Sequence, residues 1–316
     1  MSLQIFQTSQ NPVDAVSATG VLLRNLIDYA GLFPPASLGM APSVANYDVY
    51  SRSEWSWILG RFIVPATRLD EFEAAIAELP TPITGTDFVN WRLSALLGSD
   101  PAADTARIHE FNARMTNFAP RRMAVVESVE VKVASPAEII RLSEIIPAEL
   151  AAYFEFPLSS CTEFIAAVAK CGRKAKIRMG GETADNFPAP EGVIKFLRRC
   201  AASNVPFKAT AGLHHPLRSV HRFTYEPDSA AGTMHGFLNV FMAALFLRAG
   251  MKAELAAEVL EEESAQAFQF EFDGVSWREH QLSRHQIADA RRDFAVSFGS
   301  CSFTEPVNDL RTMHLL

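Results

Sequence analysis

The stretch from residue 174 to residue 215 contains polar side chains that could carry chemistry. Lys208 lies in an apolar run that we predict to be a strand, and His214 and His215 follow in the next loop. Burial removes water from a lysine, lowers its pKa and leaves a fraction as the neutral amine, which attacks carbonyl carbons. Histidine has a pKa near working pH and suits general acid or base catalysis. We therefore interpret this stretch as the rim of an active site.

The preceding predicted strand ends in groups that suit an anion. Arg178 is followed closely by Gly180 and Gly181, and Thr210 closes the next strand after Lys208. A planar guanidinium binds carboxylate or phosphate with two hydrogen bonds, and paired glycines allow backbone N–H groups to approach the anion. The alternative is a turn that needs positive φ, with Arg178 bonded to a carboxylate of a neighbouring strand.

The chain alternates between predicted strands and predicted helices, joined by short connections. We expect strands at residues 27–31, 58–64, 88–96, 122–129, 151–156, 175–179, 206–210 and 268–272, and residues near 294–298 are an alternative to residues 27–31 for one of the eight. Such alternation implies parallel pairing through right-handed crossovers, and eight units predict a (βα)8 barrel. An open doubly wound sheet is the alternative, but the turn at residues 31–34 lacks its glycine-rich phosphate loop.

We expect one domain spanning residues 1–316, with an N-terminal helix over residues 14–26. An insertion follows the seventh strand: residues 217–233 are predicted to be a long polar loop, which could act as a lid. Residues 297–303 are apolar, so we expect this C-terminal tail to pack on the barrel.

In a parallel barrel, the active site lies at the carboxyl ends of the strands. The polar residues at the predicted strand ends are therefore candidate site residues. Besides Arg178, Lys208 and Thr210, these are Asp28, Arg61, Glu127 and Glu155. We expect Glu127 and Glu155 to be catalytic, and Asp28 and Arg61 to bind substrate.

The segment Phe207 to Gly212 resembles the lysine strand of class I aldolases of the deoxyribose-phosphate aldolase type, in which small hydroxyl residues and a glycine follow a lysine. The resemblance covers six residues, and it implies that Lys208 is a Schiff-base lysine. The alternative is that Lys208 forms a structural ion pair with Glu127 or Glu155, or positions a carboxylate substrate.

Four histidines within residues 214–235 raise the alternative of a divalent metal site. Imidazole and carboxylate suit zinc, manganese or iron. The ligands would be His214 and His235 with a carboxylate, for which Glu155, Glu182 and Asp228 are candidates. Neither HxH on a first strand nor HExxH occurs, and adjacent residues such as His214 and His215 point to opposite sides of an extended chain. Our first choice therefore includes no metal and no other cofactor.

Composition narrows the classes of partner. The 316 residues carry a formal net charge of -7, which gives no general attraction to nucleic acid or to acidic membrane surfaces. The longest apolar run, residues 237–247, contains Asn239 and is too short to cross a bilayer, so we expect a buried helix.

The four cysteines show no CxxC and no zinc-finger spacing, which suits a reducing cytoplasm. We also see no secretion signal in residues 1–11, and we therefore expect a cytoplasmic protein. Cys161 at a predicted helix start and Cys301 between two serines are candidate nucleophiles. Such residues are more often small buried hydrophobes.

Three hypotheses follow. The first is a carbon-carbon lyase or isomerase that acts on a small anionic metabolite, with Lys208 as nucleophile or positive charge and His214 or His215 as proton donor. The second is a metal-dependent hydrolase or lyase. The third is a non-catalytic ligand-binding barrel, with the apolar helix at residues 234–249 in a homo-oligomer interface.

Overall fold

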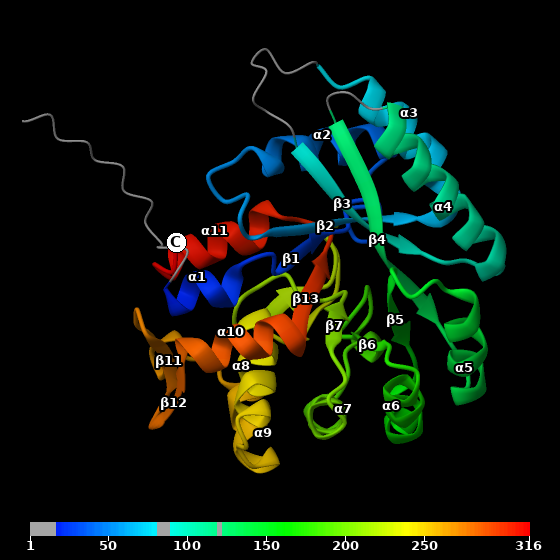
Figure 1. The fold of residues 1–316 in the computed structure, drawn as a ribbon. Coiled ribbons are helices and arrows are strands. Elements are labelled where there is room, and N and C mark those ends of the chain that lie inside the picture. The colour runs from blue at the N-terminus through cyan, green and yellow to red at the C-terminus, as the bar shows by residue number, and fades with distance from the viewer. Residues whose placement is uncertain (1–16, 81–88, 119–121) are drawn as a thin grey trace, which may run out of the picture.

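A closed barrel of eight parallel strands forms the centre of the protein, in the order β1-β13-β7-β6-β5-β4-β3-β2. The structure is a computed structural model that describes residues 17–80, 89–118 and 122–316. The barrel strands are β1 (Ile27–Tyr29), β2 (Leu59–Pro65), β3 (Val89–Leu96), β4 (Arg122–Lys132), β5 (Ala151–Glu155), β6 (Lys174–Arg178), β7 (Phe207–Thr210) and β13 (Ala295–Ser300). The prediction of a (βα)8 barrel is confirmed (Figure 1).

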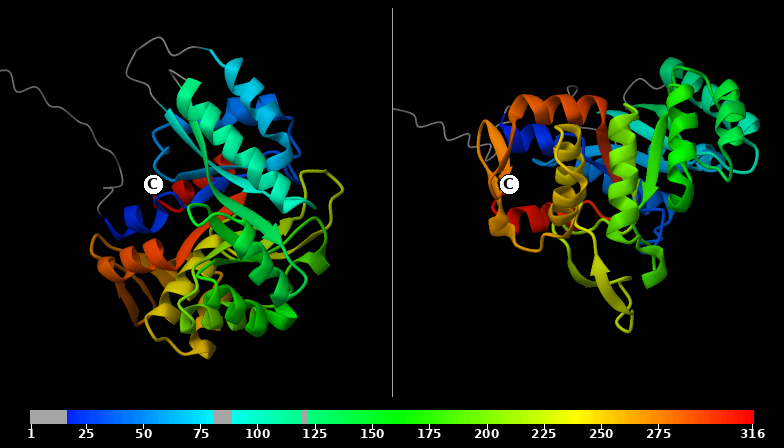
Figure 2. Two further views of the ribbon diagram at one scale, coloured as in Figure 1. Left: turned by 45° about the vertical axis from the view of Figure 1, so that its right-hand side comes forward. Right: turned by 90° about the horizontal axis from the view of Figure 1, so that it is seen from below.

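Helices surround the barrel on its outer side (Figures 1 and 2). They are α1 (Ala18–Leu23), α2 (Met40–Ser51), α3 (Leu69–Ala77), α4 (Pro101–Phe118), α5 (Pro136–Ile145), α6 (Cys161–Lys170), α7 (Pro190–Ala202), α8 (Phe237–Arg248), α9 (Ala253–Glu261), α10 (Arg284–Asp293) and α11 (Thr304–Thr312). Short 3-10 turns lie at Ala66–Arg68, Leu158–Ser160, Ala184–Asn186 and Ala265–Ala267. Side chains set the starts of three described helices: Ser17 caps α1, Ser135 caps α5 and Ser283 caps α10, because each hydroxyl accepts a hydrogen bond from a backbone N–H of the first turn.

The predicted eighth strand at residues 268–272 is wrong, because β13 closes the barrel between β1 and β7. Residues Phe268–Phe270 (β10) instead pair antiparallel with β11 (Gly274–Trp277), which pairs with β12 (His280–Ser283). The alternation of polar and apolar residues that suggested a strand is typical of a half-exposed antiparallel sheet. A barrel strand is buried on both faces, and the small and apolar residues of β13 fit that environment. The tail segment at residues 297–303 therefore supplies a barrel strand instead of packing on the barrel.

The predicted polar loop at residues 217–233 is a β-hairpin of β8 (Ser219–Arg222) and β9 (Ala231–Met234). The hairpin projects from the body of the barrel (Figure 2, right view). Most of its residues are exposed or half-buried, so no apolar alternation marks it in the sequence.

The apolar helix α8 is buried within this chain, from Phe237 to Leu247. Asn239 is also buried, and its amide donates hydrogen bonds to the carbonyl oxygens of Val259 and Glu262, both at 2.8 Å. The composition of α8 is thus explained by packing inside the chain and does not require an oligomer interface. None of the helices that the structure describes is both long and apolar enough to span a membrane.

Candidate active site

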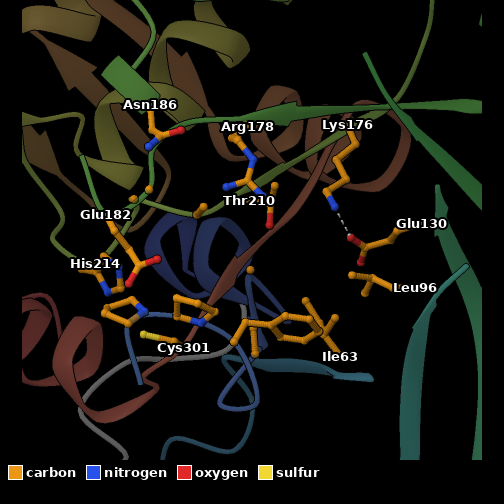
Figure 3. Close-up of a pocket in the computed structure, with 18 of the residues that line it drawn as sticks. Ile63, Leu96, Glu130, Lys176, Arg178, Glu182, Asn186, Thr210, His214 and Cys301 are labelled. Carbon is orange, nitrogen blue, oxygen red and sulfur yellow. Dashed lines mark ion pairs between the residues drawn. The ribbon is translucent and has the colours of Figure 1, made fainter. Parts of the chain in front are cut away.

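A cavity of about 350 Å³ opens at the carboxyl ends of the barrel strands. Its lining includes Lys176 and Arg178 from β6, Thr210 from β7, His214 from the following loop and Cys301 directly after β13. Figure 3 shows that Lys176 faces Glu130 at one end, that His214 and Cys301 lie together at the other, and that Arg178 and Thr210 lie between them. The carboxyl-end position agrees with the location of active sites in barrels of this kind.

Five charged side chains that alternate in sign run from the interior of the barrel to this cavity, which Glu130 and Lys176 line. Lys208 Nζ lies 2.7 Å from Asp28 Oδ2 and 2.6 Å from Glu130 Oε1. Lys176 Nζ lies 2.8 Å from Glu130 Oε2 and 2.9 Å from Glu155 Oε2. Because each buried charge has an opposite charge at hydrogen-bond distance, the series satisfies groups that would be very costly alone.

These ion pairs set the protonation states of the series. Burial alone would raise the pKa of Glu130, but the ammonium groups of Lys176 and Lys208 hold it well below its usual range. Burial would likewise lower the pKa of both lysines, yet their carboxylate partners raise it above the usual value. A lowered pKa for Lys208 is the expectation from the sequence. This expectation is wrong in direction, because the two carboxylates raise the pKa by more than desolvation lowers it.

Lys208 lies inside the barrel and does not line the cavity. The lysine that lines the cavity is Lys176. The Lys208 side chain is 1% exposed, whereas that of Lys176 is 8% exposed and reaches the lining. Sequence reasoning missed Lys176, although a strand places residues i and i+2 on the same face and Arg178 had already been selected. Lys208 does form structural ion pairs, as the alternative expected, but its partners are Asp28 and Glu130 instead of Glu127 or Glu155.

Arg178 is bonded to a carboxylate of the neighbouring strand, as one interpretation expected, but neither Gly180 nor Gly181 has the positive φ that this interpretation assigned to the turn. Its Nε lies 3.4 Å from Glu155 Oε1, its Nη1 donates to the carbonyl oxygen of Gly180 at 3.2 Å, and the side chain is 51% exposed. The guanidinium therefore remains accessible at the cavity, which Gly181 also lines.

Gly180 supports the cavity without lining it. A Cβ atom on Gly180 would lie 2.7 Å from Cα of Gly212, which itself has φ of +68°. The two loops after β6 and β7 pack backbone to backbone here, so glycine is required at both positions.

Asp28, Arg61 and Glu127 form a supporting network outside the lining. Arg61 Nε lies 2.6 Å from Glu127 Oε1, and the Arg61 backbone N–H donates to Asp28 Oδ1 at 2.7 Å. Arg92 also pairs with Glu127 at 2.8 Å. The structure therefore does not bring Arg61 or Glu127 to the cavity, and it uses Asp28 to hold Lys208.

His214 is the histidine that faces the cavity. Burial alone would lower its pKa, but hydrogen bonding to Cys301 and to Glu305 raises the pKa of His214 to about 9. His214 Nδ1 lies 3.3 Å from Glu305 Oε2, and the pKa of Glu305 is lowered in turn by His214 despite its burial. At neutral pH the imidazole is therefore protonated and suited to act as a general acid.

His215 points away from this cavity, as expected for adjacent residues. Its Nδ1 lies 2.7 Å from Asp309 Oδ2, and its ring stacks on His221 with centroids 3.4 Å apart. Both rings line a second cavity of about 310 Å³ under the β8-β9 hairpin, which His214 also borders. His235 lines neither of these two cavities. Its Nε2–H donates a hydrogen bond to the carbonyl oxygen of Pro188 at 2.8 Å.

The suggested metal ligands are not brought together. Within residues 17–80, 89–118 and 122–316, no three His, Cys, Asp or Glu side chains form a group that could hold a metal ion. Glu182 lies near His214 in the cavity lining, whereas His235 does not reach it. Lys208 pairs with carboxylates inside the barrel and Arg178 lines the cavity, so neither faces the outer helices; an outward position would have favoured the non-catalytic ligand-binding barrel.

Comparison of the chain with models of known families and with curated proteins gave no match.

Proposed function

We propose that the protein is an enzyme that cleaves or forms a carbon-carbon bond in a small anionic metabolite, with the cavity as its active site. The observation that carries the proposal is that three cationic groups, Lys176, Arg178 and His214, line one cavity from neighbouring barrel elements. Lys176 lies at one end of the cavity, His214 at the other and Arg178 between them (Figure 3). A substrate that fills the cavity therefore contacts all three.

Arg178 binds the anionic group of the substrate. Its side chain is half exposed and is held by Glu155 and the Gly180 carbonyl oxygen, so it is oriented before the substrate arrives. A pre-oriented guanidinium loses little conformational entropy when it binds a carboxylate or phosphate.

Lys176 stabilises negative charge that develops on a substrate oxygen. Carbon-carbon cleavage next to a carbonyl group leaves an enolate, and a fixed ammonium in a site with little water stabilises such an oxyanion strongly. The raised pKa of Lys176 keeps this charge in place at neutral pH. In the direction of bond formation, His214, protonated at the other end of the cavity, donates a proton to the carbonyl oxygen of the second half of the substrate, and in the direction of cleavage the neutral imidazole takes that proton from the hydroxyl group.

Enolate formation is tested by exchange of carbonyl α-protons in D₂O, followed by NMR, with pyruvate, 2-oxobutyrate and dihydroxyacetone phosphate as probes. We expect wild type to catalyse exchange for at least one probe. Lys176→Met should reduce the rate on the order of 100-fold or more. Arg68→Met is the matched control, because Arg68 pairs with Glu71 on the surface and should leave the rate unchanged. Absence of exchange with every probe, or equal exchange in Lys176→Met, would contradict the proposal.

A Schiff base at Lys176 is a second mechanism for the same reaction class. The observation that favours it is that Lys176 lines the cavity, whereas Lys208 does not. Borohydride reduction in the presence of the same probes distinguishes the two mechanisms, because only the Schiff base leaves a stable adduct on Lys176.

A further inference from the structure

Cys301 and His214 lie side by side at the end of the cavity opposite Lys176 (Figure 3). Cys301 directly follows β13 and His214 lies four residues after the end of β7, and these two strands are neighbours in the barrel. Both side chains line the cavity, although Cys301 is only 6% exposed, and Cys301 contributes to the raised pKa of His214. A thiol and an imidazole thus lie next to each other where a substrate can reach them.

Two further side chains hold this pair. Glu305, in the first turn of α11, lies 3.3 Å from His214 Nδ1 and therefore fixes the orientation of the ring. Tyr225, from the β8-β9 hairpin, donates to Glu305 Oε2 at 3.2 Å, and its oxygen lies 3.6 Å from Cys301 Sγ. A thiol, an imidazole that can carry protons and a carboxylate that orients the imidazole form the arrangement used in thiol catalysis.

We propose that Cys301 is a nucleophile that adds reversibly to the aldehyde group of a small anionic substrate, with His214 as its proton carrier and Glu305 as a positioning residue. Sγ forms a bond to the aldehyde carbon, and the C=O π electrons move to the oxygen. The protonated imidazole of His214 gives its proton to that oxygen and takes the thiol proton in its place, which gives a hemithioacetal and needs no other reactant. Arg178, midway along the cavity, binds the anionic group.

The other buried cysteines lack this setting. Cys161 and Cys200 are fully buried, and burial raises the pKa of both thiols, as expected for unreactive core residues. Cys171, at the end of α6, is more exposed than Cys301. It serves as an internal reference, since simple accessibility would make Cys171 the faster thiol.

This inference rests on the proposed function in one respect: the aldehyde would be the second product of the carbon-carbon cleavage. Thiol reactivity is measured without any α-proton exchange, so the two proposals can fail separately. Loss of exchange with a reactive Cys301 would contradict the lyase, whereas exchange with an unreactive Cys301 would contradict this inference.

The test is the rate of alkylation of each cysteine by iodoacetamide, measured by peptide mass spectrometry on the folded full-length protein. We expect Cys301 to react at least 10-fold faster than Cys171. His214→Asn and Glu305→Gln should each slow Cys301 and leave Cys171 unchanged. Glu305→Gln alters a partly exposed residue, so it keeps the test valid if His214→Asn does not fold.

Glyoxylate and succinic semialdehyde then probe the substrate class. Either one should slow alkylation of Cys301 reversibly in wild type, and less so in Arg178→Met. Alkylation of Cys301 no faster than Cys171, or equal rates in wild type and both variants, would overturn the nucleophile. A fast Cys301 that neither aldehyde protects would overturn the assignment of an anionic aldehyde.

Discussion

Lys176 and Lys208 occupy paired positions on neighbouring strands β6 and β7, and each donates to a different oxygen of Glu130. Lys208 completes its pairing with Asp28 in the interior, and Lys176 completes its pairing with Glu155 at the cavity. The two lysines thus have different roles. Lys208 neutralises buried carboxylates, and Lys176 places a positive charge where a ligand in the cavity can meet it.

Lys208→Met should strongly destabilise the fold, because it leaves Asp28 and Glu130 buried without their shared cation. Breaking a buried ion pair on one side costs about 3–5 kcal/mol in free energy of unfolding. Urea denaturation measures this loss. Arg68→Met, which removes the surface pair with Glu71, should cost less than about 1 kcal/mol. Equal stability of the two variants would contradict the structural role of Lys208.

Borohydride should trap no adduct at Lys208 with any carbonyl probe, because this side chain is charged, 1% exposed and outside the cavity lining. Peptide mass spectrometry after reduction locates any modified lysine. An adduct at Lys208 would show that the resemblance to the aldolase lysine strand extends to function and that the placement of Lys208 here is wrong.

His214 makes stability depend on pH. Its pKa is about 9 in the folded protein and near the ordinary value of 6.5 in the unfolded chain. A raised folded pKa gives stability that is fully present below pH 6.5 and is lost as pH rises through 9. The difference in unfolding free energy between wild type and His214→Gln, up to roughly 3 kcal/mol, should decline across this window. A constant difference from pH 6 to pH 10 would contradict the protonated pair with Glu305.

Gly212→Ala should damage the cavity as well as the local backbone. Gly212 has φ of +68°, and an added Cβ would lie 2.7 Å from Cα of Gly180 and 2.9 Å from the Phe187 ring. Gly172→Ala is the matched control, since its φ is +63° and nothing lies within 4 Å of the added Cβ. Both variants carry backbone strain on the order of 1 kcal/mol. Only Gly212→Ala should also weaken anion binding, which thermal shift in the presence of phosphate or pyruvate measures.

The barrel could be predicted because buried strands and amphipathic helices leave different periodicities in the sequence. The identity of its last strand could not be predicted, since Ala295–Ser300 mixes small, polar and apolar residues and most of them are buried only because the barrel closes around them. The hairpin over residues 219–234 was missed for a related reason, because its strands cover no apolar core.

The candidate site was predictable in part. Strand-end position selected Arg178, Thr210 and His214, which all reach the cavity. It also selected Arg61 and Glu127, which pair with each other instead, because sequence does not give the height of a side chain within the barrel. Glu130 was not among the predicted site residues, because β4 extends to Lys132, beyond the predicted strand end at residue 129.

The central claim is that Lys176 and Arg178 bind a small anion in the cavity at the carboxyl ends of the strands. The most direct measurement is the shift in melting temperature produced by phosphate, pyruvate, succinate and dihydroxyacetone phosphate in wild type, Lys176→Met, Arg178→Met and the Arg68→Met control. A ligand at 100 times its Kd adds about 2.7 kcal/mol to the stability of the protein that binds it. We predict that at least one anion raises the melting temperature of wild type and of the control but of neither cavity variant. Equal shifts in all four proteins, or no shift in wild type with any anion, would contradict the account.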